Sequence, residues 1–490
     1  MTARFDNSYA RLPERFYASV NPTAVAEPRL IRLNEPLASE LGFEPDWLKS
    51  PAGLAMLAGN SLPDGTNPIA TAYAGHQFGG FSPQLGDGRA ILLGEVVDCR
   101  GQRRDIQLKG AGPTPFSRRG DGRAALGPVL REYIVSEAMA VLGVPTTRAL
   151  AAVTTGEAVR RETLLPGAIL TRVASSHIRI GTFQYFAARG DVEALRLLAD
   201  HVLARHYPDL PGGEGRYLAL LKAIITAQAG LVARWMLIGF IHGVMNTDNM
   251  SVAGETIDYG PCAFMDAYDP GTVFSSIDER GRYAYGNQPP IARWNLTRLA
   301  EALLPLLADD QDKAVSIAQA ALDDFDRQVQ SEMIAGFRRK LGLASEDSED
   351  VSLIRSLLET MQQGRADFTL VFRRLSEEGT QSRDGGACRD LFSNPAAFDS
   401  WEHRWRERLL NEDIPAALRQ SAMRRVNPLF IPRNHRVEAV IEAAVERQDF
   451  APFAELLAVL SAPYDMQPGR DHYALPPAAH ERVLATFCGT

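Results

Sequence analysis

Three oxygen-bearing side chains, Asp248, Asn249 and Asp258, lie close together in the segment from Ile241 to Gly260. Mg²⁺ prefers hard oxygen ligands and shares them with phosphate groups. A carboxylate in the same place can accept a proton from a hydroxyl group. The segment therefore predicts a magnesium site with Asn249 and Asp258 as ligands, and a substrate that carries phosphate. Mn²⁺ is a possible replacement at such an oxygen-rich site.

The same segment follows the order of the catalytic loop of protein kinases and their small-molecule relatives, in which a histidine, a base aspartate and a metal-binding asparagine precede a D-F-G triplet. Alignment on His242 places Asn249 at the asparagine and Asp258 at the D-F-G aspartate. It also places Val244 where the base should be, and a valine cannot accept a proton. Asp248 is the carboxylate that could replace that base. We expect His242 to be a hydrogen-bonded structural residue.

A glycine-rich turn at residues 86–89 precedes the first clear strand. Gly86 and Gly88 would let the backbone approach a phosphate closely with its N–H groups, and Arg89 adds a cation. An ordinary β-turn has the same composition, so this turn by itself is weak evidence.

A lysine and a glutamate follow this turn at regular intervals. Lys109 ends the next strand, Glu132 lies on the helix after it, and Glu137 is a second candidate partner. A lysine held by a helix glutamate can contact nucleotide phosphates without being lost to solvent. A lone lysine in a hairpin is usually just solvated. The order of turn, strand lysine and helix glutamate is what favours a nucleotide site.

The elements that must position these residues are strand-rich in the first half and helical in the second. Residues 90–97 and 104–110 predict a hairpin, 128–143 a helix and 167–174 a further strand. Residues 250–258 predict a short hairpin that turns at Gly254. Periodic apolar stretches predict helices in five later regions, 191–207, 215–242, 295–341, 350–375 and 437–461. We therefore expect an α+β protein with two lobes.

The chain has 490 residues and a formal net charge of −8, which excludes broad attraction to nucleic acid or to an anionic membrane. Phosphate binding must therefore be local. The N-terminus has no apolar signal segment, and residues 223–241 are expected to form a buried core helix. Four widely spaced cysteines without a CxxC pair fit neither a zinc cluster nor a disulfide framework. We expect a cytoplasmic protein with no nucleic-acid or membrane partner.

The sequence resembles one family closely, the selenoprotein O family of pseudokinase-like protein adenylyltransferases. The resemblance extends from about Phe5 to the C-terminus, and no motif position departs from the family pattern. The matching stretches include YAGHQFGGFSPQLGDGRA, DIQLKGAGPTPFSRRGDGRA, ILTRVASSHIRIGTF, HGVMNTDNMS, TIDYGPCAFMD and GNQPPIARWNLTRLAEAL.

The resemblance implies a protein-kinase-like bilobal fold in which ATP binds in a reversed orientation. The implied divisions are an N-terminal extension packed on the core over residues 1–75, a strand-containing nucleotide lobe over 76–180, and a larger, mainly helical lobe over 181–490. The last contains the catalytic hairpin 242–262 and a C-terminal extension. The implied activity is transfer of AMP from ATP to Ser, Thr or Tyr hydroxyls of protein substrates, with release of pyrophosphate.

The family's functional residues carry over to matching positions of this chain. Asp248 would be the proton acceptor, Glu132 would pair with Lys109, and Asn249 and Asp258 would hold Mg²⁺. Family members also suggest a redox pair, here Cys262 with Cys488 near the C-terminus. The residues implied to bind ATP are Gly86, Gly88, Arg89, Lys109, Asp121, Gly122, Arg172, Arg179 and Asp258.

The cations in this set also suit AMP transfer on chemical grounds, because the departing pyrophosphate develops charge that positive groups stabilise. Three alternatives stay open. One is a true small-molecule or protein kinase, against which Val244 argues; another is a protein uridylyltransferase that uses UTP with Mn²⁺. The third is a catalytically silent nucleotide-sensing scaffold.

Overall fold

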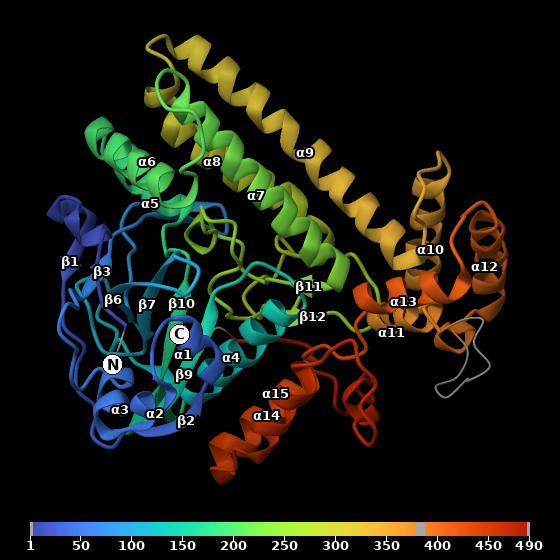
Figure 1. The fold of residues 1–490 in the computed structure, drawn as a ribbon, viewed down its shortest axis with the longest axis horizontal. Helices are drawn as coiled ribbons and strands as arrows, with labels where there is room; N and C mark the ends of the chain where they lie inside the picture. Colours follow the sequence, from blue (N-terminus) through green and yellow to red (C-terminus); the bar gives the residue numbers. More distant parts are fainter. Residues whose placement is uncertain (1–2, 378–387, 488–490) are drawn as a thin grey trace.

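The computed structural model describes residues 3–377 and 388–487, and its first part is built on an antiparallel sheet (Figure 1). The strands follow the order β1-β3-β6-β7-β10-β9-β2, and a short strand, β8, also pairs with β10. The strands of this sheet are β1 (Tyr17–Ser19), β2 (Arg29–Leu33), β3 (Ile69–Thr71), β6 (Ala90–Val97), β7 (Arg103–Lys109), β8 (Ala124–Ala125), β9 (Arg148–Arg160) and β10 (Leu164–Ala174).

The predicted hairpin is confirmed as β6 and β7, whose register pairs Ala90 with Lys109. Aliphatic side chains from these strands are buried, as expected for a central part of a sheet. The long strand β9 is absent from the sequence prediction. Its sequence, RALAAVTTGEAVR, is rich in alanine, which has a low strand propensity. The strand is therefore recognised only from its pairing with β10 and β2.

Helices cover both faces of the sheet. The short helices α1 (Glu35–Glu40), α2 (Pro45–Lys49) and α3 (Pro51–Leu57) close one core against β6, β7 and β9. The predicted helix at 128–143 is α4 (Leu126–Val141), which packs against β9 and β10 on the other face. Two C-terminal helices, α14 (Asn434–Arg447) and α15 (Ala451–Leu460), cover α4 from outside (Figure 1).

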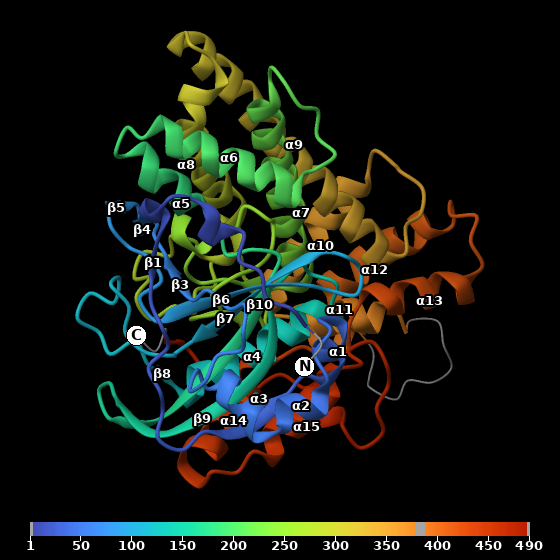
Figure 2. The same ribbon diagram turned by 60° about the vertical axis from the view of Figure 1, so that its left-hand side comes forward.

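A second, larger core lies in a helical part that extends away from the sheet (Figures 1 and 2). The sheet and the helices together confirm the α+β class. The helices of this part are α5 (Ile180–Ala187), α6 (Val192–His206), α7 (Arg216–Ile238), α8 (Gln288–Leu307), α9 (Gln311–Leu341), α10 (Asp350–Gly364), α11 (Phe368–Leu375), α12 (Pro395–Leu409) and α13 (Ala416–Val426).

Helix α7 is long and apolar enough to cross a membrane by composition alone. In this structure it packs against α8 and α9, and side chains such as Leu221, Ile224 and Trp235 are buried. This packing agrees with the core helix predicted from the polar interruptions in its sequence.

The segment after α7 forms a loop whose two ends are joined by a small sheet. Strands β11 (Phe240–Ile241) and β12 (Ala263–Phe264) pair and enclose residues 242–262. The hairpin predicted within 250–258 is wrong. Ser251 instead bridges to Arg179, and Thr256 bridges to Thr146, so partners from elsewhere in the chain take the place of local pairing.

A buried arginine ties the C-terminal helices to the end of this loop. The Arg433 side chain is fully buried and contacts Asp367 at 2.6 Å and Asp266 at 2.5 Å, just beyond β12. It also donates to the carbonyl oxygen of Ala474 at 2.9 Å. Asp367 in turn caps α11 through the backbone N–H of Leu370.

We expect Arg433→Met to lower the free energy of unfolding by about 3–5 kcal/mol, because it leaves the buried Asp367 and the partly buried Asp266 without their cation. Urea denaturation at neutral pH measures this loss. The matched control is Arg389→Met, which breaks a pair with Asp399 whose side chains are 48% and 46% exposed. That exposed pair should contribute at most about 1 kcal/mol. Equal losses in the two variants would contradict a central role for Arg433.

Candidate active site

A cavity of about 850 Å³ lies where the sheet meets the helical part. Its walls come from the glycine-rich turn before β6, the end of β7, strand β10 and the loop between β11 and β12. The predicted nucleotide, base and metal residues that line it are Gly86, Gly88, Arg89, Lys109, Asp121, Gly122, Arg172, Arg179, Asp248, Asn249 and Asp258.

Lys109 and Arg172 are held by one carboxylate at the back of this cavity. Glu132, on α4, contacts Lys109 Nζ at 2.6 Å and Arg172 Nε at 2.5 Å. The pair predicted from spacing is thus present. Burial, and then the nearby Arg172, lower the pKa of Lys109 to about 8. Glu137, the second candidate, lies elsewhere and binds Arg148 at 2.7 Å.

Asp258, in the loop between β11 and β12, forms ion pairs with residues of the sheet and of the helical part. Its carboxylate binds Arg172 Nη2 at 2.7 Å and also pairs with Arg179, which precedes α5. Burial alone would raise the pKa of Asp258, but Arg179 and Arg172 outweigh it and hold the pKa well below the usual range. The residue has φ of +60°, a strained region for a non-glycine residue that is typical of functional sites.

Asp248 differs from Asp258 because no cation of the described residues forms an ion pair with its carboxylate; Arg179 donates instead to its backbone carbonyl oxygen at 2.6 Å. Its side chain is buried, Oδ2 accepts a hydrogen bond from Gln77 Nε2 at 3.1 Å, and Oδ1 has no partner among the described residues. Burial raises the pKa of Asp248 to about 6. Asp248 lines the cavity, and a buried carboxylate with an oxygen that no described group occupies is suited to accept a proton.

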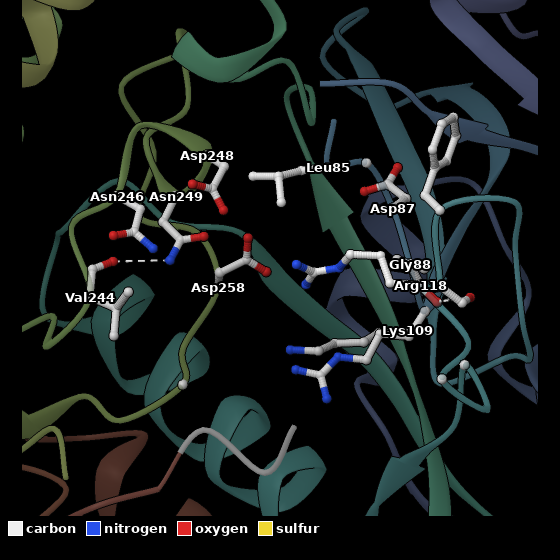
Figure 3. A pocket seen from close by; sticks show the side chains of 18 of the residues that line it. Leu85, Asp87, Gly88, Lys109, Arg118, Val244, Asn246, Asp248, Asn249 and Asp258 are labelled. Atoms are coloured by element: carbon white, nitrogen blue, oxygen red, sulfur yellow. Dashed lines mark hydrogen bonds between the residues drawn. The ribbon is translucent and has the colours of Figure 1, made fainter. Parts of the chain in front are cut away.

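Asn249 is oriented by the backbone of Val244. Its Nδ2 donates to the carbonyl oxygen of Val244 at 3.0 Å, which turns the amide oxygen toward the side of Asp258 (Figure 3). Together with Asp248, these residues offer an all-oxygen donor set, and Oδ1 of Asp248 lacks a partner within the described chain. This chemistry fits Mg²⁺.

The two glycine-rich segments pack against each other at the opposite wall. A side chain at Gly86 would strike the ring of Phe116 at 2.5 Å, and one at Gly122 would strike the backbone oxygen of Gly112 at 2.0 Å. Both glycines also have positive φ. Asp121 lies at the rim, where it binds Arg161 at 2.9 Å.

Several lining residues escaped the sequence prediction. Asp87 is buried between the two glycines, accepts from the hydroxyl of Thr71 at 2.7 Å and lies 3.7 Å from Arg179. Its position inside the glycine-rich turn could have indicated that it lines the site.

Four further cations of the lining could not be predicted, because their positions depend on the unpredicted strand β9 and on the packing of a loop. They are Arg118, Arg123, Arg160 and Arg161.

Charge is divided unequally across the cavity. Lys109 extends from the sheet side toward Asp258, while Asp248, Asn249 and Asp258 lie on the loop side (Figure 3). The lining contains eight cationic and four acidic residues. This is the local excess of positive charge that the acidic chain needs in order to hold a polyphosphate.

The remaining predicted residues have clear positions or lie outside the described chain. His242 is buried and its Nε2 is 2.9 Å from the carbonyl oxygen of Ile257, which confirms a structural role. Cys262 is buried, and Cys488 lies outside the described residues. Thr486 is described, and its hydroxyl donates to the carbonyl oxygen of Pro261 at 2.6 Å.

Comparison with known proteins shows the family of the chain. The family model described as protein adenylyltransferase SelO matches residues 1–461. Proteins named protein nucleotidyltransferase YdiU are 66% identical in Rhodopseudomonas palustris strain BisB5 and 66% identical in Bradyrhizobium sp. strain ORS 278, over 99% of both chains in each case. The relative of that name in Methylorubrum populi is 65% identical over 99% of both chains. The chain is therefore a nucleotidyltransferase that belongs to the SelO family.

Proposed function

We propose that this enzyme transfers AMP from ATP to Ser, Thr or Tyr hydroxyls of other proteins. The observation that carries the proposal is the pairing of a buried, uncompensated carboxylate, Asp248, with a strongly cationic wall in one cavity. The family model named for protein adenylyl transfer supports the choice of AMP. The names of the relatives specify a protein substrate and leave the nucleotide open.

We further propose that the sheet part and the helical part correspond to the two lobes of a protein-kinase-like fold. Support comes from Lys109 bound to Glu132 of a packed helix, and from Asn249 and Asp258 in one loop. These are the relative positions of the kinase lysine, helix glutamate and metal-binding residues. Val244 at the position of the kinase base argues against phosphoryl transfer by the usual route.

In the proposed reaction, the oxygen of the acceptor hydroxyl forms a bond to the α-phosphorus of ATP. Asp248 accepts the proton that this hydroxyl loses. The bond from the α-phosphorus to the bridging oxygen breaks, and pyrophosphate leaves with that oxygen. Lys109, Arg172 and Arg179 supply positive charge in the same cavity, where negative charge develops. Asn249 and Asp258 would hold Mg²⁺, which neutralises phosphate charge when bound.

Radioactive ATP distinguishes the candidate activities. With Mg²⁺ and a mixture of purified proteins, label at the α-phosphate should appear on protein, whereas label at the γ-phosphate should appear in released pyrophosphate. Protein labelling from the γ-position would contradict AMP transfer and favour a kinase. A parallel reaction with α-labelled UTP and Mn²⁺ tests uridylyl transfer. Absence of any transfer would favour a nucleotide-sensing scaffold.

Asp248→Asn should lower kcat for AMP transfer by about 10²–10⁴, because the amide keeps the shape of the side chain and cannot accept the proton. Calorimetric titration should show ATP binding close to that of the wild type. The control is Asp309→Asn, which removes a charge at an exposed position in the helical part. Equal activity of Asp248→Asn and the wild type would contradict the assignment of Asp248 as the base.

We also propose redox control through a reversible disulfide between Cys262 and Cys488. Cys262 directly follows Pro261, and the hydroxyl of Thr486 binds the carbonyl oxygen of Pro261. Thr486 is two positions before Cys488 in the sequence, and it forms a parallel bridge with Ser275. These contacts bring the C-terminal segment beside the loop that carries Asp258.

Under mild oxidation, mass spectrometry of a proteolytic digest should find a peptide that joins Cys262 to Cys488, and a reductant should remove it. Cys99 is exposed and provides the internal control for nonspecific oxidation. The proposal fails if Cys262 is found unlinked in the oxidised protein, or if it pairs with Cys99 to the same extent.

A further inference from the structure

A small hairpin covers the proposed base. Strands β4 (Gly75–Gln77) and β5 (Gly80–Ser82) pair with each other and lie next to α5 (Figure 2). Gln77 Nε2 donates to Asp248, and the backbone N–H of His76 donates to the Thr247 hydroxyl at 2.7 Å. The approach is so close that a side chain at Gly75 would lie 2.4 Å from Asp248 Oδ1. The hairpin and the base are therefore positioned together.

The turn of this hairpin contains an unexpected residue. Phe78 and Gly79 form the two-residue turn, and their φ values are +51° and +87°. Turns of this type favour asparagine, aspartate or glycine, because both positions need the left-handed region. A bulky residue with positive φ is an outlier. It is held there by its backbone N–H, which donates to Asn246 Oδ1 at 3.0 Å and to the Tyr283 hydroxyl at 3.2 Å.

The Phe78 side chain is not needed to fill a core. It is 36% exposed, lines the cavity that contains Asp248, and meets the ring of Tyr283 edge to face at 5.1 Å. Phe81, on the same hairpin, is 42% exposed, and Ile277, which lines the same cavity, is 58% exposed. Phe78 and Ile277 therefore place an apolar surface in the cavity that contains the proposed base. Phe81 pairs with His76 and belongs to the other face of the hairpin.

We propose that Phe78, supported by Ile277, binds an apolar side chain next to the acceptor hydroxyl of the protein substrate. This inference rests on the proposed function. The acceptor hydroxyl must come within hydrogen-bond reach of Asp248, and the chain on either side of it must remain accessible from solvent. Phe78 directly follows Gln77, the residue that binds Asp248. In this proposal the Phe78 ring therefore contacts the substrate residue next to the one that carries the acceptor hydroxyl.

The position of the cations argues for the acceptor as the occupant of this surface. Lys109, Arg118 and Arg160 line the cavity from the sheet side, where they suit phosphate groups. Phe78 projects from a hairpin that is bound instead to Thr247 and Asn246 of the loop that carries the base. Aromatic residues, phenylalanine included, are enriched where proteins bind each other.

The test uses peptides copied from the sites labelled in the α-phosphate experiment, each made with apolar and with asparagine residues beside the acceptor. The wild type should prefer the apolar peptides by at least about tenfold in kcat/KM. Phe78→Asn should abolish this preference and leave KM for ATP unchanged. It should also keep or raise the melting temperature, because asparagine tolerates the left-handed turn.

Phe78→Gly is the second variant and should behave in the same way. The control, Leu410→Asn, removes a leucine that is 85% exposed on the helical part, and it should retain the preference. A preference that survives in Phe78→Asn, or one absent from the wild type, overturns the inference and leaves AMP transfer intact. A raised KM for ATP with the preference intact assigns Phe78 to the nucleotide and also overturns it. If the α-phosphate label appears on no protein at all, the proposed function is overturned together with this inference.

Discussion

The whole site depends on the charge balance around Asp258. Two buried arginines, Arg172 from β10 and Arg179 from the start of α5, share its carboxylate, and Arg172 also binds Glu132. Each of these charges would be costly to bury alone, and each is compensated by a neighbour from a different element. The sheet, α4, α5 and the loop must therefore assemble together for any of these ions to be stable.

This network determines the net charge of the cavity. Asp258 and Glu132 neutralise part of the positive charge that Lys109, Arg172 and Arg179 bring together. The further arginines at the rim leave an excess of cations over the acidic lining residues. The proposed substrate, a polyphosphate with its metal ion, would supply the missing negative charge. The acidic net charge of the chain is therefore compatible with tight local binding of an anion.

Much of this site could be predicted from the sequence because its parts lie in short, ordered motifs. The spacing of Lys109 and Glu132 indicated their contact, which the structure confirms. What the sequence could not provide were contacts across long separations. The hairpin predicted at 250–258 was wrong because Ser251 and Thr256 pair with distant residues. Gln77 is 171 positions from Asp248, and no local pattern relates them.

In the proposed kinase-like arrangement Val244 takes the position of the base, and the proposed base, Asp248, is held by this distant hairpin. The Val244 carbonyl accepts from Asn249, so the loop orients the proposed metal ligand at that position. The neighbouring Asp248 lines the same cavity, but among the described residues neither Arg172 nor Arg179 forms an ion pair with its carboxylate. Its orientation is set by Gln77 and by the glycine at position 75, which leaves room for Oδ1. The proposed base therefore depends for its position on β4 and β5, the same elements proposed to meet the acceptor.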